Sequence, residues 1–160
     1  MARQGDYLLE SGKLNEARDS YKKALDAIEK STLSEEFKNN ARQAHLITEV
    51  ETAVRMKDFA RAKTNAEQYQ KNAEANHHPI QMQTAHELAG IIALNEQKYD
   101  AALSELKKAN DRNPRNLYRI GEAYAGLGDR EKAKEAWMRT ANFNEINYDL
   151  AFVRAKARQQ

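Results

Sequence analysis

One pattern of side-chain sizes, small then bulky then small, recurs four times along the chain and constrains its fold more than any other feature. It reads Ala17-Tyr21-Ala24, Ala62-Ala66-Tyr69 in a degraded form, Ala102-Leu106-Ala109 and Ala133-Trp137-Ala141. Each copy follows a turn that has its own predicted helix before it. A two-helix unit cannot bury its apolar stripe alone, so such units stack on one another. The repetition therefore predicts an array of helical hairpins.

The composition agrees with an all-α chain and excludes several classes of site. Helix-favouring residues are abundant, proline occurs only twice, and no segment alternates β-branched or aromatic residues with polar ones. The 26 basic and 24 acidic side chains are interspersed, which is typical of a solvated surface and not of a nucleic-acid-binding face. The absence of cysteine excludes disulfides and thiol catalysis. It fits cytosolic and exported proteins equally, so the sequence assigns no compartment to this soluble chain.

Turn and capping residues divide the chain into predicted helices. Thr32 followed by Glu35 forms a candidate capping box, and Asp58 and Asp129 are candidate N-caps. Pro79 and Pro114 suit the first position of a helix, where the missing N–H costs nothing. We expect helices over about 2–11, 15–30, 79–95, 100–110 and 147–158.

A long amphipathic run after Thr32 ends near Met56. One stripe of this run carries the apolar residues Phe37, Ala41, Ala44, Ile47, Val50 and Val54. In the final predicted helix, Leu150, Val153 and Ala157 share one side, and basic residues near its end complement the helix dipole. Three basic residues are too few for firm binding to phosphate or lipid, so we interpret them as a solvated face.

The turns and the size pattern occur together in three predicted hairpins. The last hairpin carries Gly121, Tyr124, Gly128, Ala133, Trp137 and Ala141, with Arg130 in place of an aromatic residue after the turn. The one before carries Gly90, Tyr99, Ala102, Leu106, Ala109 and Pro114, with Gln97 in place of the turn glycine. The first carries Gly5, Leu8, Gly12, Leu14, Ala17, Tyr21, Ala24 and Leu25. These hairpins resemble tetratricopeptide repeats, whereas residues 33–76 match only at Val50, Phe59 and Ala62.

The resemblance implies an α-α superhelix, or solenoid, of about four hairpins with a C-terminal capping helix. The expected repeats of this single array span 1–30, 32–76, 79–113 and 114–143, and the cap spans 144–160. Small residues such as Gly90 let paired helices approach closely, and Leu106 or Trp137 then fills the gap between neighbouring hairpins. The spacing departs from the family's period around the second repeat, so we expect an irregular superhelix. Gly5 would fall midway along a first helix, which suggests that the chain is a fragment trimmed inside that helix.

In tetratricopeptide repeats the first helices line a concave groove that receives a peptide or a helix of a partner. Carried over to this chain, the groove residues are Ile47, Glu51, Val54, Arg55, Glu87, Ile91, Leu94, Tyr118 and Glu122. Apolar anchors with surrounding charges suit such a segment. An alternative interpretation is that Ile47, Ile91 and Leu94 belong to the core and that the glutamates are ordinary solvated charges.

The carboxylate clamp of chaperone-binding members of the family is absent. Its positions are occupied here by Ala2, Asp6, Thr48, Thr84 and Leu88. None of these side chains donates a charged hydrogen bond to a carboxylate.

The sequence offers little for catalysis or metal binding. There is no phosphate-binding loop, no nucleophile elbow and no two-histidine zinc helix. His77, His78 and His86 form the one histidine cluster, but no carboxylate lies at a ligand spacing beside them, so we interpret them as loop and packing residues. The sequence therefore predicts a non-catalytic scaffold without cofactor or metal that binds another protein.

Self-assembly is the alternative function. An array trimmed inside its first helix would leave Leu8 and Leu9 poorly covered, and a homodimer could form there.

Overall fold

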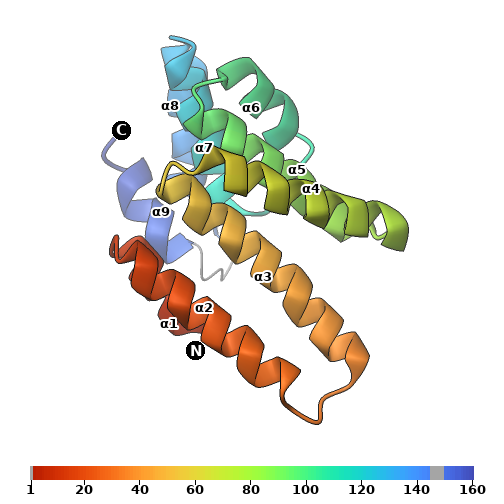
Figure 1. Cartoon of the computed structure of the whole chain (residues 1–160). Helices are drawn as coiled ribbons and strands as arrows, with labels where there is room; N and C mark the ends of the chain where they lie inside the picture. The colour runs from red at the N-terminus through yellow and green to blue at the C-terminus, as the bar shows by residue number, and fades with distance from the viewer. Residues whose placement is uncertain (1, 145–149) are drawn as a thin grey trace. The chain divides into compact units, whose positions relative to one another are not determined.

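The computed structural model describes residues 2–144 and 150–160, and every regular element within them is an α-helix (Figure 1). The all-α repeat fold predicted from the sequence is confirmed. The chain divides into two compact units, Met1–Asn72 and Ala73–Gln160. The boundary lies inside one long helix, α4 (Phe59–Asn76), which belongs to the second predicted repeat. The prediction of a single array with the repeat bounds given above stays a prediction.

The first unit contains α1 (Ala2–Glu10), α2 (Leu14–Glu29), α3 (Glu35–Arg55) and most of α4. Gly12 adopts a φ of 78° in the turn between α1 and α2, a conformation that glycine reaches without strain. Leu9 packs with Ala17 and Tyr21 in a buried cluster and is only 3% exposed. The expectation that Leu9 is poorly covered was therefore wrong, because its side chain lies inside the α1–α2 hairpin. Leu8 is half-buried.

The second unit contains the end of α4 and five further helices. They are α5 (Pro79–Asn95), α6 (Tyr99–Leu106), α7 (Pro114–Gly126), α8 (Arg130–Ala141) and α9 (Leu150–Ala157). A core cluster joins Ala93 of α5 and Leu106 of α6 to Ala123 of α7, so Leu106 does link neighbouring hairpins as predicted.

Three hairpins share the same close contact between a glycine of the first helix and a bulky residue of the second. A Cβ atom built on Gly5 would lie 2.3 Å from the Tyr21 ring, one on Gly90 would lie 2.7 Å from Leu106 Cγ, and one on Gly121 would lie 2.4 Å from Trp137 Nε1. The bulky residue follows its glycine by the same interval each time (5 to 21, 90 to 106, 121 to 137). No side chain larger than hydrogen fits at these glycines without displacing the partner. Trp137 therefore fills a space within its own hairpin.

The second predicted hairpin reverses these sizes. At the same interval its first helix carries Val50, which is completely buried, and its second helix carries Ala66. In this hairpin the larger side chain therefore belongs to the first helix and the smaller one to the second. This reversal explains why the family's pattern is weak between residues 33 and 76.

Most of the predicted helix caps are confirmed. Asp58 Oδ1 accepts a hydrogen bond from the backbone N–H of Arg61 at 3.1 Å, and Asp129 Oδ1 accepts one from the N–H of Lys132 at 3.2 Å. The capping box at Thr32 was wrong. Ser34 is the N-cap of α3 instead, and its hydroxyl accepts from the N–H of Phe37 at 3.3 Å. The segment before Ser34 bends back from α2, so the helix begins later than the Thr-to-Glu spacing indicates.

Other predicted boundaries shift at the ends of two helices. The helix that begins near Asp100 ends at Leu106 and not at Asn110, because the chain turns there toward Pro114. The expected start of the last helix at 147 lies outside the described residues. Within α9, the prediction that Leu150, Val153 and Ala157 share an inward side is confirmed, since all three are buried.

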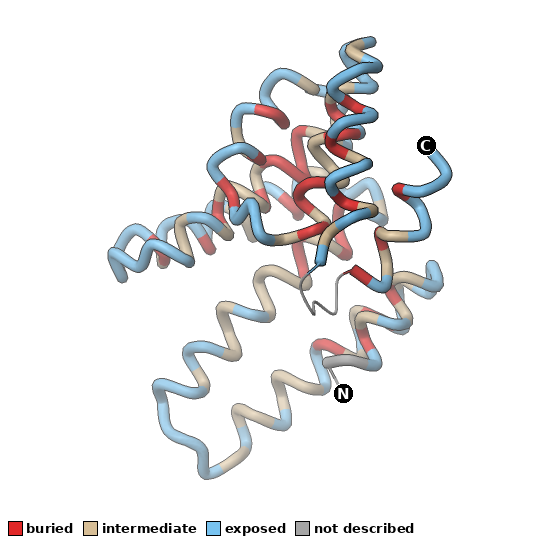
Figure 2. The backbone as a smooth tube through the Cα atoms, turned by 180° about the vertical axis from the view of Figure 1, so that it is seen from behind, coloured by how far each residue is buried: buried red, intermediate tan, exposed pale blue. Residues whose placement is uncertain are grey.

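The α2–α3 hairpin extends into a region with little burial, which we call the arm and define as residues 22–48. None of these residues is classed as buried, and the hairpin correspondingly shows only intermediate and exposed colours over this stretch (Figure 2). Phe37 and Ala44 are exposed. The predicted apolar stripe of this run is therefore buried only at Val50 and Val54.

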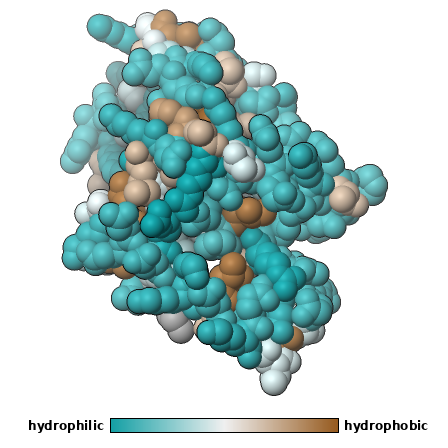
Figure 3. Space-filling model, viewed as in Figure 1, coloured by the Kyte–Doolittle hydropathy of each residue, from teal (hydrophilic) through white to brown (hydrophobic). Residues whose placement is uncertain are grey.

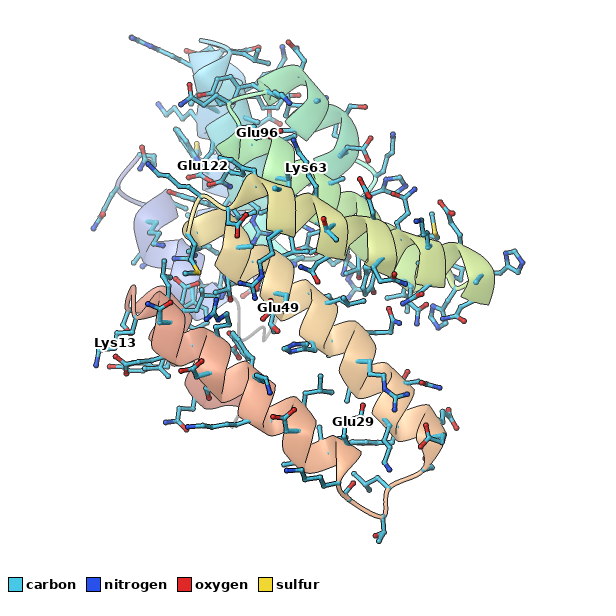
Figure 4. All side chains as sticks on the ribbon, in the orientation of Figure 1. Lys13, Glu29, Glu49, Lys63, Glu96 and Glu122 are labelled. Carbon is cyan, nitrogen blue, oxygen red and sulfur yellow. The ribbon has the colours of Figure 1, made fainter. Side chains whose placement is uncertain are left out.

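Ion pairs within the arm hold α2 against α3. Glu29, at the C-terminal end of α2 (Figure 4), accepts hydrogen bonds from Arg42 Nε at 2.7 Å and Arg42 Nη2 at 2.8 Å. This bidentate contact holds the pKa of the Glu29 carboxyl below its ordinary value.

We expect Arg42→Gln to return the pKa of Glu29 to about its ordinary value of 4.5. A carboxylate with a lowered pKa stabilises the fold above its unfolded-state pKa, and this contribution disappears as the pH falls through the folded-state value. A ¹³C NMR titration of the glutamate carboxyls measures the shift. Replacing Lys63, an exposed base on α4, by Gln is the control and should leave Glu29 unchanged. An unaltered Glu29 titration in Arg42→Gln would show that this pair does not form in solution.

Candidate functional site

An ion pair links the first helices of the two hairpins in the second unit. Glu87 of α5 accepts a hydrogen bond from Arg119 Nη1 of α7 at 2.7 Å. Their side chains are only 16% and 14% exposed, respectively. Charges with so little access to water interact strongly, and removing one of them destabilises the fold because the other is left buried without a partner. The pair therefore fixes α5 and α7 side by side.

Asn113, the N-cap of α7, and Asn116, in the first turn of α7, make further hydrogen bonds around this pair. Asn113 donates its side-chain amide to Glu87 at 3.3 Å and accepts from the backbone N–H of Arg115 at 2.9 Å, which caps α7. Asn116 is fully buried, donates to the carbonyl of Asn110 at 3.1 Å and accepts from Arg119 Nη1 at 3.1 Å. A buried amide is tolerated because these bonds satisfy it.

The predicted groove residues of this unit differ in accessibility. Ile91 is 5% exposed and belongs to the core. Leu94 and Tyr118 are half-buried, and Glu122, one helical turn after Tyr118, is exposed. The accessible members are thus one aliphatic, one aromatic and one acidic side chain on the first helices α5 and α7.

The C-terminal helix α9 packs beside α7. The Arg115 guanidinium lies 4.6 Å from the centre of the Phe152 ring, a cation–π contact between the two helices. Near Tyr118, burial raises the pKa of the phenol above its ordinary value, and the charge of Glu122 raises it further. A hydrogen bond with the Gln160 side chain opposes these effects. Tyr118 therefore stays a neutral hydrogen-bonding group.

In the first unit, the four predicted groove residues lie along the C-terminal half of α3. Val54 is 4% exposed, and Ile47 and Glu51 are half-buried. Arg55 donates to Glu10 of α1 at 2.8 Å, an ion pair that links two first helices as Glu87 and Arg119 do in the second unit. Arg55 and Glu87, two of the predicted groove residues, already have partners within the chain.

Two segments of the chain, residues 1–31 and 114–139, match the family model described as tetratricopeptide repeat. These two segments are similar to tetratricopeptide repeats. The matched segments hold the Gly5–Tyr21 and Gly121–Trp137 contacts, so the family's pattern and the close helix approach coincide. No curated protein and no solved structure matches the chain. Tetratricopeptide repeats generally mediate protein–protein interaction and are typically non-catalytic.

Sequence reasoning missed the residues that hold the repeats together through polar contacts. Arg119 and Asn116 were not singled out, although Asn110, Asn113 and Asn116 recur at intervals of three residues around Pro114. Asparagine at such positions often bonds to nearby backbone groups, so this run was the available signal. The partner of Arg119 lies 32 residues away, and no local pattern indicates it.

The histidine cluster of the repeats separates in the structure. His86 lies 2.7 Å from Glu105 of α6, and His77 and His78 are exposed. Burial raises the pKa of Glu105, but hydrogen bonds with His86 and Lys108 outweigh this effect and leave the pKa below its ordinary value. Among residues 2–144 and 150–160, no three His, Asp or Glu side chains are grouped to hold a metal ion. None of the described helices combines the length and apolarity needed to cross a membrane.

Proposed function

We propose that this tetratricopeptide-repeat protein is a non-catalytic scaffold that binds a helix or an extended segment of another protein. The binding surface consists of the accessible residues of the first helices α5 and α7, namely Leu94, Tyr118 and Glu122. The observation that carries the proposal is the position of these side chains on two helices that Glu87 and Arg119 hold together. A fixed spacing between helices orders the surface before binding and lowers the entropy that association costs.

The chemistry of this surface suits a partner with an apolar anchor and a nearby basic group. Most residues on the face shown in Figure 3 are hydrophilic, and hydrophobic residues form separate small patches. Binding would thus depend on a few anchor residues and not on one broad apolar area. Glu122 is exposed, so its carboxylate is accessible to such a basic group.

In the first unit, Ile47 and Glu51 of α3 form a second proposed contact region. In this proposal, Val54, Arg55 and Ile91 do not contact the partner. Val54 and Ile91 are buried in the core, and Arg55 forms an ion pair with Glu10.

Site-specific photo-crosslinking in cells of the source organism tests the proposal. A photoreactive phenylalanine in place of Tyr118 should give discrete adducts with another protein. The same residue in place of Lys134, an exposed position on the second helix α8, is the matched control and should give few. Glu122→Lys should reduce the Tyr118 adducts at least about fivefold, because it reverses the charge beside the anchor. The proposed surface would be contradicted by an equal yield of adducts at position 134, or by a yield at position 118 that Glu122→Lys does not change.

A further inference from the structure

Each of the four predicted hairpins closes its first helix with the same kind of turn. In the third hairpin, the backbone N–H of Gln97 donates to the carbonyl of Leu94 at 3.0 Å, and the next N–H donates to the carbonyl of Ala93 at 2.9 Å. The same pair of bonds closes the other three hairpins. It is the Schellman motif, in which the residue after the helix adopts a left-handed backbone conformation. The left-handed residues, with their φ angles, are Gly12 (78°), Lys57 (61°), Gln97 (61°) and Gly128 (80°).

Two of these turns hold a residue other than glycine in the left-handed conformation. A Cβ atom makes this conformation unfavourable by on the order of tenfold in an equilibrium constant, whereas glycine adopts it freely. The side chains of Lys57 and Gln97 are exposed, and neither forms a hydrogen bond or an ion pair with any other residue that the structure describes. The cost at these two turns is therefore not offset by a polar contact of the side chain that causes it.

The turn of the last hairpin offers a comparison without steric crowding. A Cβ atom built on Gly128 would have no heavy atom within 4 Å apart from those of its chain neighbours. A side chain at this position would meet open space, and its cost would be that of the left-handed backbone alone. Gly128 is therefore a position where this cost can be introduced without a clash.

We propose that the turns at Lys57 and Gln97 are weak points of the two central hairpins, where the end of the first helix opens while the rest of its unit stays folded. Opening at Lys57 releases the carbonyl of Val54, and opening at Gln97 releases that of Leu94. The turns that carry glycine open less often, because they lack the cost of a Cβ atom. Leu94 is part of the proposed binding surface, so opening at Gln97 makes the end of α5 its adjustable part. Only this last consequence rests on the proposed function.

Native-state hydrogen exchange followed by NMR measures the opening of each turn without any partner. In the natural chain, after correction for intrinsic rates, the amides of Gln97 and Lys98 should exchange at least about threefold faster than those of Gly128 and Asp129. They should also exchange faster than the amide of Ala123, which is buried in the core. Protection equal to that of Ala123 would show that the Gln97 turn opens only when the whole unit unfolds, which would overturn the proposal.

Substitutions at the left-handed residues test whether the backbone conformation governs the opening. Gln97→Gly should slow exchange at its turn about threefold, because the removed cost of the Cβ atom exceeds the freedom that glycine gains in the open state. Gln97→Ala is the matched control: it shortens the side chain but keeps the Cβ atom, so the rate should not change. Lys57→Gly and Lys57→Ala should behave in the same way. Gly128→Ala should speed exchange at its own turn about threefold, since no clash accompanies it.

Two results would contradict the role of the left-handed residues. If Gln97→Gly and Gln97→Ala exchange at the same rate, the Cβ atom does not govern the turn. If Gly128→Ala exchanges like the natural chain, the left-handed conformation carries no cost at these turns.

Discussion

Replacing Gly121 by valine should destabilise the protein by about 3 kcal/mol, at the upper end of what an overpacked contact usually costs. The Cβ atom of the new side chain would lie 2.4 Å from Trp137 Nε1 and 2.5 Å from Trp137 Cδ1. The indole cannot easily move away, because its N–H donates to the carbonyl of Tyr118 at 3.3 Å. The loss should appear in urea unfolding followed by circular dichroism.

A double-mutant cycle separates this clash from a general effect of valine in a helix. In the Trp137→Ala background, Gly121→Val should cost less than about 1 kcal/mol, because the indole that it strikes is gone. The double variant reproduces the sizes of Val50 and Ala66 in the second hairpin. Ala125→Val, at an exposed position of α7, is the control and should cost about 0.5 kcal/mol from helix propensity alone. Additive effects at positions 121 and 137 would show that the two residues are not in contact.

Replacing Arg119 by alanine should cost about 2–3 kcal/mol, because it leaves the poorly exposed Glu87 carboxylate without its cation. Full burial would cost more, but both side chains keep some access to water. The Asn113 amide at 3.3 Å is a weaker substitute. Asn116 would also lose the guanidinium that donates to its side-chain oxygen. Urea unfolding measures the loss, and hydrogen exchange should show it first in α7.

Removing the second charge should restore part of the stability. The variant Glu87→Gln with Arg119→Ala carries no unpaired charge at this position, so it should be more stable than Arg119→Ala alone. Lys134→Ala, at an exposed position of α8, is the control and should change stability by less than about 0.5 kcal/mol. If Arg119→Ala behaves like Lys134→Ala, the ion pair does not hold α5 and α7 together.

The sequence predicted the hairpins well because their signals are local. Each of these signals spans fewer than 20 residues. They are the turns at Gly12 and Gly128, the prolines at the first position of a helix, and the interval between Gly121 and Trp137. The start of α3 was missed because Thr32 has a glutamate three residues later, as a capping box requires, whereas Ser34, the actual N-cap, has Phe37 at that position.

The candidate site was less predictable because burial and pairing depend on distant residues. Ile91 and Leu94 look alike in the sequence, yet one is core and the other is half-buried. In the sequence, Arg55 and Glu87 are indistinguishable from solvated charges, because their ion-pair partners lie on other helices.

Helix pairing through glycine is the physical basis of this fold, and proton NMR measures it directly. Nuclear Overhauser effects should join the Hα protons of Gly121 to the indole of Trp137, those of Gly90 to the methyl groups of Leu106, and those of Gly5 to the ring of Tyr21. The glycine protons near the two aromatic rings should also show large ring-current shifts. Ordinary random-coil shifts for these glycines, with no Overhauser effect to the residue 16 positions later, would contradict the close approach of the paired helices.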